Sequence, residues 1–107
     1  MKLWLKPLLN KLTNNLVQQN LDVKSIILFG SHARGDSRLS SDIDIAIVSN
    51  NSLSHESRGL IRCILDELHE TVEINPFFTK QEYIEKANDY FDTNFYIKNE
   101  GIILWQE

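Results

Sequence analysis

Two aspartates interrupt an apolar segment of the sequence, SDIDIAIV at residues 41–48. Isoleucines alternate with Asp42 and Asp44, and this period of two predicts a strand with the isoleucines on one face. The two carboxylates then share the other face, roughly 6–7 Å apart at the backbone. Like charges so close raise each other's pKa, and a divalent cation would remove the repulsion. Carboxylate oxygens suit Mg²⁺, which also takes waters and substrate phosphate oxygens. The pattern therefore predicts half of a metal–nucleotide site.

The segment just before the aspartates could supply the other half. Gly30 ends an apolar run and has no side chain, so that the backbone there can approach a ligand closely. Backbone N–H groups and the hydroxyl of Ser31 can bind phosphate oxygens. Arg34 adds a positive charge suited to phosphate, and Gly35 permits a further tight turn. We therefore expect Gly30, Ser31 and Arg34 to bind the phosphates of a nucleotide.

The elements that position these residues follow from hydrophobic periodicity and turn signals. Between the first two strands, the segment 30–41 is expected to be a loop with room for one short helical turn. A capping-box signature, Thr79-Lys80-Gln81-Glu82, opens one of the helices. The order indicates an α/β fold, in which helices pack on a small sheet and residues 1–107 form one domain. The expected helices are 7–19, 54–70, 79–86 and 93–100, and the expected strands are 25–29, 42–48 and 71–74, the last limited by Pro76.

Composition narrows the class of protein. The net charge is −4 and the basic residues are scattered, which argues against a nucleic-acid-binding module and favours a small-molecule or protein partner. No apolar run reaches membrane-spanning length, so we expect no membrane association. Cys63 is the only cysteine, which excludes an internal disulfide and makes the cytoplasm the expected location.

Three histidines, His32, His55 and His69, show no spacing typical of metal ligands. We interpret them as surface or helix-face residues. His32 lies in the loop beside the aspartates and could touch a substrate, although no chemistry demands it.

The combination of Gly30-Ser31, ten intervening residues and Asp42-Ile43-Asp44 resembles the signature of the polymerase β-like nucleotidyltransferase superfamily. The segments LFGSHARG and SDIDIAIV are especially similar to the minimal nucleotidyltransferases, the MNT proteins. The resemblance is strong over residues 24–78 and implies a small mixed β-sheet with packed helices. It also implies a third carboxylate on a later strand, for which Glu73, between Val72 and Ile74, is the candidate. A glutamate is longer than the aspartate often found there.

The resemblance implies a mechanism. An acceptor hydroxyl attacks the α-phosphate of a nucleoside triphosphate, most simply ATP, and pyrophosphate leaves. Asp42 and Asp44 would hold Mg²⁺, Gly30 and Ser31 would cradle the β- and γ-phosphates, and Arg34 would assist. Glu73 would be a further metal ligand or the base nearest the acceptor.

The chain has little sequence from which to build an acceptor site, so another chain or a second copy of this one would have to supply it. MNT proteins pair with HEPN proteins in toxin–antitoxin systems, and the resemblance implies transfer of AMP to such a partner. One alternative is an antitoxin that neutralises a HEPN partner by contact without catalysis. The other is a transferase acting on a small hydroxylated molecule such as an aminoglycoside, which the missing acceptor domain disfavours.

Overall fold

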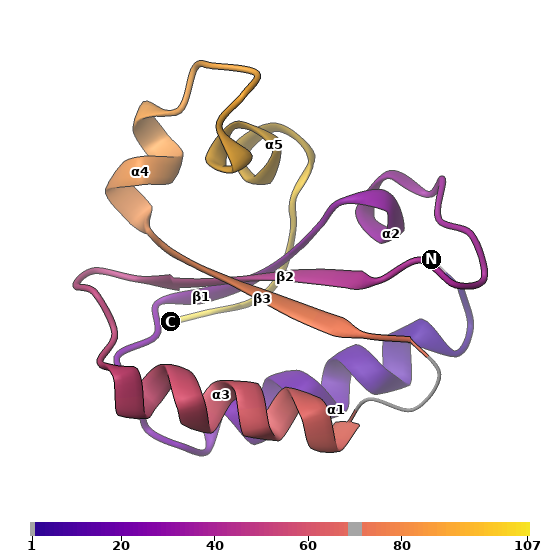
Figure 1. Ribbon diagram of the computed structural model, residues 1–107, viewed down its shortest axis with the longest axis horizontal. Coiled ribbons are helices and arrows are strands. Elements are labelled where there is room, and N and C mark those ends of the chain that lie inside the picture. The colour runs from indigo at the N-terminus through magenta and orange to yellow at the C-terminus, as the bar shows by residue number, and fades with distance from the viewer. Residues whose placement is uncertain (1, 69–71) are drawn as a thin grey trace.

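The computed structural model describes residues 2–68 and 72–107 and confirms the α/β fold, with a four-stranded sheet and helices on both of its faces (Figure 1). The end of the helix expected at 54–70 and the start of the strand expected at 71–74 fall on residues 69–71, outside the described residues. The helices are α1 (Leu5–Val17), α2 (Ser31–Arg34), α3 (His55–Leu68), α4 (Gln81–Lys86) and α5 (Thr93–Glu100), and the strands are β1 (Ser25–Phe29), β2 (Ile43–Ser49), β3 (Ile74–Lys80) and β4 (Ile102–Gln106).

The sheet has the strand order β3-β2-β1-β4 and is mixed. β1 pairs antiparallel with β2 on one side and with β4 on the other, whereas β2 and β3 run parallel. A parallel pair needs a crossover connection, and α3 provides it. The apolar tail near the C-terminus, which periodicity did not assign to a strand, is β4. It forms one edge of the sheet.

Each face of the sheet has its own apolar core. In Figure 1, α1 and α3 lie on one face, while α4 and α5 lie on the other. The first core joins α1 and α3 to the buried isoleucines of β1 and β2, and the second joins α4 and α5 to the alternate residues of the same strands. Ile43, Ile45 and Ile47 are fully buried in the first core, in agreement with the predicted alternation. The side chains of Asp42 and Asp44 therefore belong to the opposite face.

β3 is longer than predicted, because Pro76 lies inside it and does not end it. The N–H of Ile43 donates to the carbonyl of Glu73, at 2.8 Å. Backbone groups alternate in direction along a strand, so those of Pro76 point away from β2, toward the open edge. A proline there removes no hydrogen bond of the sheet and makes the edge less able to pair with another strand.

The predicted capping box of α4 is wrong. α4 begins at Gln81, and Lys80 precedes it as an N-cap without a side-chain hydrogen bond. The hydroxyl of Thr79 donates instead to the side chain of Asn94 in α5. Thr79 and Asn94 are both buried, so this bond joins the two helical segments on their face of the sheet. None of the helices within residues 2–68 and 72–107 is long and apolar enough to cross a membrane.

Candidate active site

β2 brings the two aspartates to the face of the sheet opposite α1 and α3. Asp44 is half-buried within the strand, and Asp42 is exposed just before it. On the neighbouring strands, Phe29 of β1 is the register partner of Asp44, and Asn75 of β3 is its partner on the other side. The floor of the site is therefore built from three adjacent strands.

Gly30 places its backbone directly against Asp44. Its φ of 78° and ψ of −158° are accessible to glycine but not to residues with a side chain. A Cβ at residue 30 would also collide with Oδ2 of Asp44. The backbone at Gly30 therefore lies against a carboxylate of the site. Its close approach to a ligand stays a prediction.

Electrostatics at the pair follow from this packing. Burial raises the pKa of Asp44 above its ordinary value, and the negative charge of Asp42 raises it further. His32 and Arg34 act in the opposite direction and lower the pKa of Asp44. The net result is a raised pKa, so the ionised form of Asp44 is less favoured than that of an exposed aspartate.

Asn75 belongs to the site, although the motifs did not single it out. Its Nδ2 donates to Oδ2 of Asp42 at 3.2 Å. The bond links β3 to the residue that precedes β2, and it fixes the carboxylate of Asp42 against the neighbouring strand. The signal was present in the sequence, because Asn75 follows Glu73 by two positions and a strand places such residues on one face.

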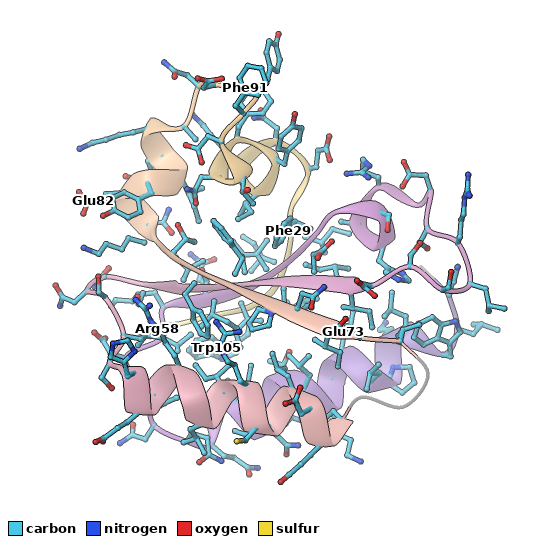
Figure 2. The ribbon with its side chains drawn as sticks, viewed as in Figure 1. Phe29, Arg58, Glu73, Glu82, Phe91 and Trp105 are labelled. Carbon is cyan, nitrogen blue, oxygen red and sulfur yellow. The ribbon has the colours of Figure 1, made fainter. Side chains whose placement is uncertain are left out.

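Glu73 lies just before β3 (Figure 2), at the end where β3 begins to pair with the segment of the chain that carries the aspartates. Its side chain is exposed, between buried Val72 and Ile74, and its carbonyl binds the N–H of Ile43. Within the described residues, no three Asp, Glu, His or Cys side chains converge as a metal-binding group. The backbone of Glu73 is thus beside Asp42, while its role as a third carboxylate stays a prediction.

Ser31 and Arg34 lie at the two ends of α2, immediately after Gly30. In this short helix the N–H groups of Ala33 and Arg34 already donate to the carbonyl of Gly30, so the N–H and hydroxyl of Ser31 are the expected phosphate donors. Arg34 is largely exposed and pairs with Asp36 at 3.1 Å and with Glu100 of α5 at 3.2 Å. Exposed pairs of this kind are weak, so a phosphate could replace either carboxylate at little cost.

His32 is buried, so its interpretation as a surface residue is wrong, whereas its alternative interpretation as a helix-face residue agrees with its place in α2. Its side chain is only 4 % exposed, and its Nε2 lies 3.0 Å from the carbonyl oxygen of Ser41. The sequence around His32 has no hydrophobic periodicity, so it gave no signal that this side chain is buried. The contact arises because the loop between α2 and β2 folds back over the helix.

The donor set fits Mg²⁺. This ion takes one or two protein carboxylates and completes its coordination with water and phosphate oxygens, so that two aspartates on one face are sufficient. Burial is the main cause of the raised pKa of Asp44, and the negative charge of Asp42 adds to it, so some repulsion between the two carboxylates remains. A cation between Asp42 and Asp44 would relieve it.

Comparison with known proteins defines the class. Residues 10–107 match the family Polymerase beta, Nucleotidyltransferase, and the chain belongs to this family. It is therefore a nucleotidyltransferase, as the Gly-Ser and Asp-Ile-Asp motifs indicated. A relative from Methanocaldococcus jannaschii, named as a putative protein adenylyltransferase, is 33% identical over 81 residues, which cover 76% of this chain and 71% of the relative.

Solved structures share the fold. A nucleotidyltransferase structure from Sulfolobus solfataricus superposes with a TM-score of 0.59 at 16% identity, covering 94% of this chain and 78% of the other. A toxin–antitoxin structure with AMP-PNP gives 0.59 at 24% identity, covering 92% and 73%. A tri-AMPylated HEPN toxin from Shewanella oneidensis in complex with its MNT antitoxin gives 0.55 at 21% identity, covering 95% and 72%. The nucleotidyltransferase fold implied by the sequence motifs is thus confirmed.

Proposed function

We propose that this chain is a Mg²⁺-dependent adenylyltransferase that moves AMP from ATP to a hydroxyl group of a partner protein, as the antitoxin of a HEPN/MNT pair. The observation that carries the proposal is the placement of Asp42 and Asp44 on one face of the sheet, with the backbone of Gly30 against Asp44. This arrangement puts carboxylates for a metal beside a turn suited to phosphates. No element of it recognises a particular acceptor.

Each residue of the site has a role in this proposal. Asp42 and Asp44 hold the metal, and the amide of Asn75 orients Asp42 for that task. Gly30 and Ser31 bind the β- and γ-phosphates through backbone N–H groups and the serine hydroxyl. Arg34 exchanges a carboxylate partner for a phosphate oxygen. Together these residues hold the triphosphate still, which is the main contribution of a protein to phosphoryl-type transfer.

Transfer itself makes one bond and breaks one bond. The acceptor hydroxyl oxygen attacks the α-phosphorus, the bond from that phosphorus to the bridging oxygen breaks, and pyrophosphate leaves. The hydroxyl proton passes to a base, for which Glu73 is our candidate because its exposed carboxylate lies at the same end of the sheet. When bound, Mg²⁺ would supply positive charge against the triphosphate.

The partner is inferred from the relatives. The Methanocaldococcus relative is named for adenylyl transfer to protein, and one fold neighbour is an MNT antitoxin in complex with an AMPylated HEPN toxin. Both support a protein hydroxyl as acceptor and a HEPN protein as partner for this chain. They also favour protein over an aminoglycoside.

The test is transfer of labelled nucleotide. The full chain is incubated with Mg²⁺, α-labelled ATP and a HEPN protein encoded beside it, and compared with the double variant D42N/D44N. We expect label on the partner with the parent chain and at least a hundredfold less with the variant, because both metal ligands are lost. D22N is the matched control, since Asp22 is exposed and precedes β1, at the end of the strand far from Gly30.

The same variants separate catalysis from contact. If the parent chain labels no partner and D42N/D44N still neutralises the HEPN protein fully, the chain acts by binding alone and the proposal is wrong. Repeating the assay with each of the other nucleoside triphosphates tests the choice of ATP. Omission of Mg²⁺, with a chelator present, should abolish labelling by the parent chain.

A further inference from the structure

His32 connects the two halves of the site. It belongs to α2, which begins directly after Gly30, while its partner Ser41 directly precedes Asp42. A carbonyl oxygen can only accept a hydrogen bond, so Nε2 of His32 must carry the proton and donate it. This bond spans the loop at its base, from the phosphate-binding turn to the first aspartate.

The imidazole ring has little freedom to move. Trp4, which precedes α1, meets it edge to face, with ring centroids 5.8 Å apart and planes at 86°. The ring is 4 % exposed, and its Nδ1 has no hydrogen-bond partner among the described residues. Burying a ring nitrogen without a partner is costly, so packing and the Nε2 bond must together hold the ring in this orientation.

The hydrogen bonds at the tip of the loop are local ones. Arg38, Leu39 and Ser40 at its tip are exposed. The local bonds of the tip, from the N–H of Arg38 to the hydroxyl of Ser41 and from the N–H of Ser41 to the carbonyl of Arg38, close only a short turn. The His32–Ser41 bond is the contact that ties this turn back to α2.

We propose that His32 is a positioning residue for the transfer reaction: its Nε2–H bond to Ser41 holds Asp42 at a fixed separation from the Gly30–Ser31 turn. The proposal rests on the proposed function, since it assigns His32 to the same metal and phosphate site. The site must bind the metal and the triphosphate at the same time. A shift of Asp42 relative to the turn would weaken the contact of Asp42 with the metal and that of the turn with the phosphates. His32 itself touches neither the metal nor the substrate in this role.

Three substitutions of His32 separate donation from packing. H32Q keeps an amide N–H at the reach of Nε2, H32N carries a shorter amide that cannot reach Ser41, and H32F keeps an aromatic ring without a donor. The matched control is N99A, because Asn99 donates a side-chain bond to a backbone carbonyl, that of Phe95, within α5. Each full-length variant is titrated with Mg²⁺ alone while the amide resonances of Asp42 and Asp44 are followed by NMR.

We expect Mg²⁺ to bind H32F and H32N about tenfold more weakly than the parent chain, as the loss of one buried hydrogen bond predicts, with H32Q within about threefold of the parent. N99A should bind like the parent. Equal weakening in H32Q and H32N, or no weakening in any variant, would overturn the proposal. Should H32F fail to fold, the H32Q–H32N pair decides by the same criterion.

The wild-type ring gives an independent result. Nitrogen-15 NMR of the parent chain should show the proton of His32 on Nε2, protected from exchange, and a proton only on Nδ1 would contradict the proposal. If the parent chain binds no Mg²⁺, the proposed function fails. In that case the Asp42 amide resonance of the metal-free variants tests His32 by itself. A resonance that is displaced in H32N but returns to the parent position in H32Q supports the positioning role. A resonance that moves in neither variant overturns it.

Discussion

Gly30 and Asp44 are in direct contact across two antiparallel strands, and Oδ2 of Asp44 occupies the space in which a side chain at residue 30 would begin. The glycine thus serves two purposes, since its backbone conformation is left-handed and its missing Cβ makes room for the carboxylate. The turn and the aspartate form one structural unit.

Replacement of Gly30 by alanine should therefore damage both stability and metal binding. The left-handed backbone alone costs about 1–3 kcal/mol for a residue with a side chain, and the carboxylate must also move. We expect G30A to lower the free energy of unfolding by at least that amount, measured by urea denaturation. G59A is the control: Gly59 lies within α3 with open space around it, so alanine there should stabilise by about 1 kcal/mol. A G30A protein as stable as the parent would contradict the packing described.

Asp44 should make the metal-free protein less stable as pH rises. Its pKa is raised in the folded state, mainly by burial and then by Asp42, so the folded protein holds the proton more tightly than the unfolded chain. Below about pH 4, the pKa of Asp44 in the unfolded chain, the carboxyl is protonated in both states. As pH rises above that value, the folded protein loses stability, and the loss is complete once pH passes the pKa of Asp44 in the folded state. D44N should therefore raise Tm at pH 7 without metal, and the gain should shrink toward pH 4. If the gain in Tm of D44N instead grew as pH fell, the pKa of Asp44 would be lowered in the folded state and the prediction would be wrong.

An additional carboxylate at residue 75 should lower the stability of the metal-free protein and raise its affinity for metal. N75D replaces the amide that donates to Asp42 with a group that repels it. Without metal we expect a lower Tm than that of the parent chain, and with Mg²⁺ a larger upward shift, because ligand binding stabilises the folded state in proportion to affinity. N88D, at an exposed asparagine after α4, should change neither value. The proposed metal position would be wrong if Mg²⁺ stabilised N75D less than the parent.

Glu73 can be tested separately from the aspartates. If its carboxylate is the base, E73Q should lower kcat by about 10²- to 10⁴-fold while KM for the triphosphate changes little. If it is a metal ligand, the concentration of Mg²⁺ needed for half-maximal rate should rise as well. E67Q is a suitable control, because Glu67 is exposed on α3. Parent-like kinetics of E73Q in both parameters would remove Glu73 from the site.

Arg34 should affect substrate binding more than folding. R34A loses exposed pairs with Asp36 and Glu100, which contribute about 0–1 kcal/mol to stability. Loss of a charge-assisted bond to phosphate should raise KM for the triphosphate about tenfold or more, with the difference smaller at high salt. R38A, at an exposed arginine in the loop that follows α2, should behave like the parent chain. An R34A variant with unchanged KM would assign Arg34 to the surface.

Much of the fold could be predicted because its signals are local. The alternation around Asp44 and the helical stripe of α3 each follow from burial of one face, which a short window of sequence records. β4 was not assigned, since its five residues do not alternate between polar and apolar. Its strand conformation depends on pairing with β1. The end of β3 was placed too early, at Pro76, because pairing decides this point as well: a strand tolerates a proline whose backbone faces the open edge of the sheet.

The sequence by itself determined the order of Gly30, Asp42 and Asp44 along one turn and one strand, and from this order the chemistry of the site was predicted. Tertiary structure alone decided what surrounds them. It brought Asn75 to Asp42 through the parallel pairing of β3 with β2, and it buried His32 between Trp4 and the returning loop. These contacts join residues that are distant in the chain or held by a loop without periodicity. Only the packing of the whole fold determines their positions.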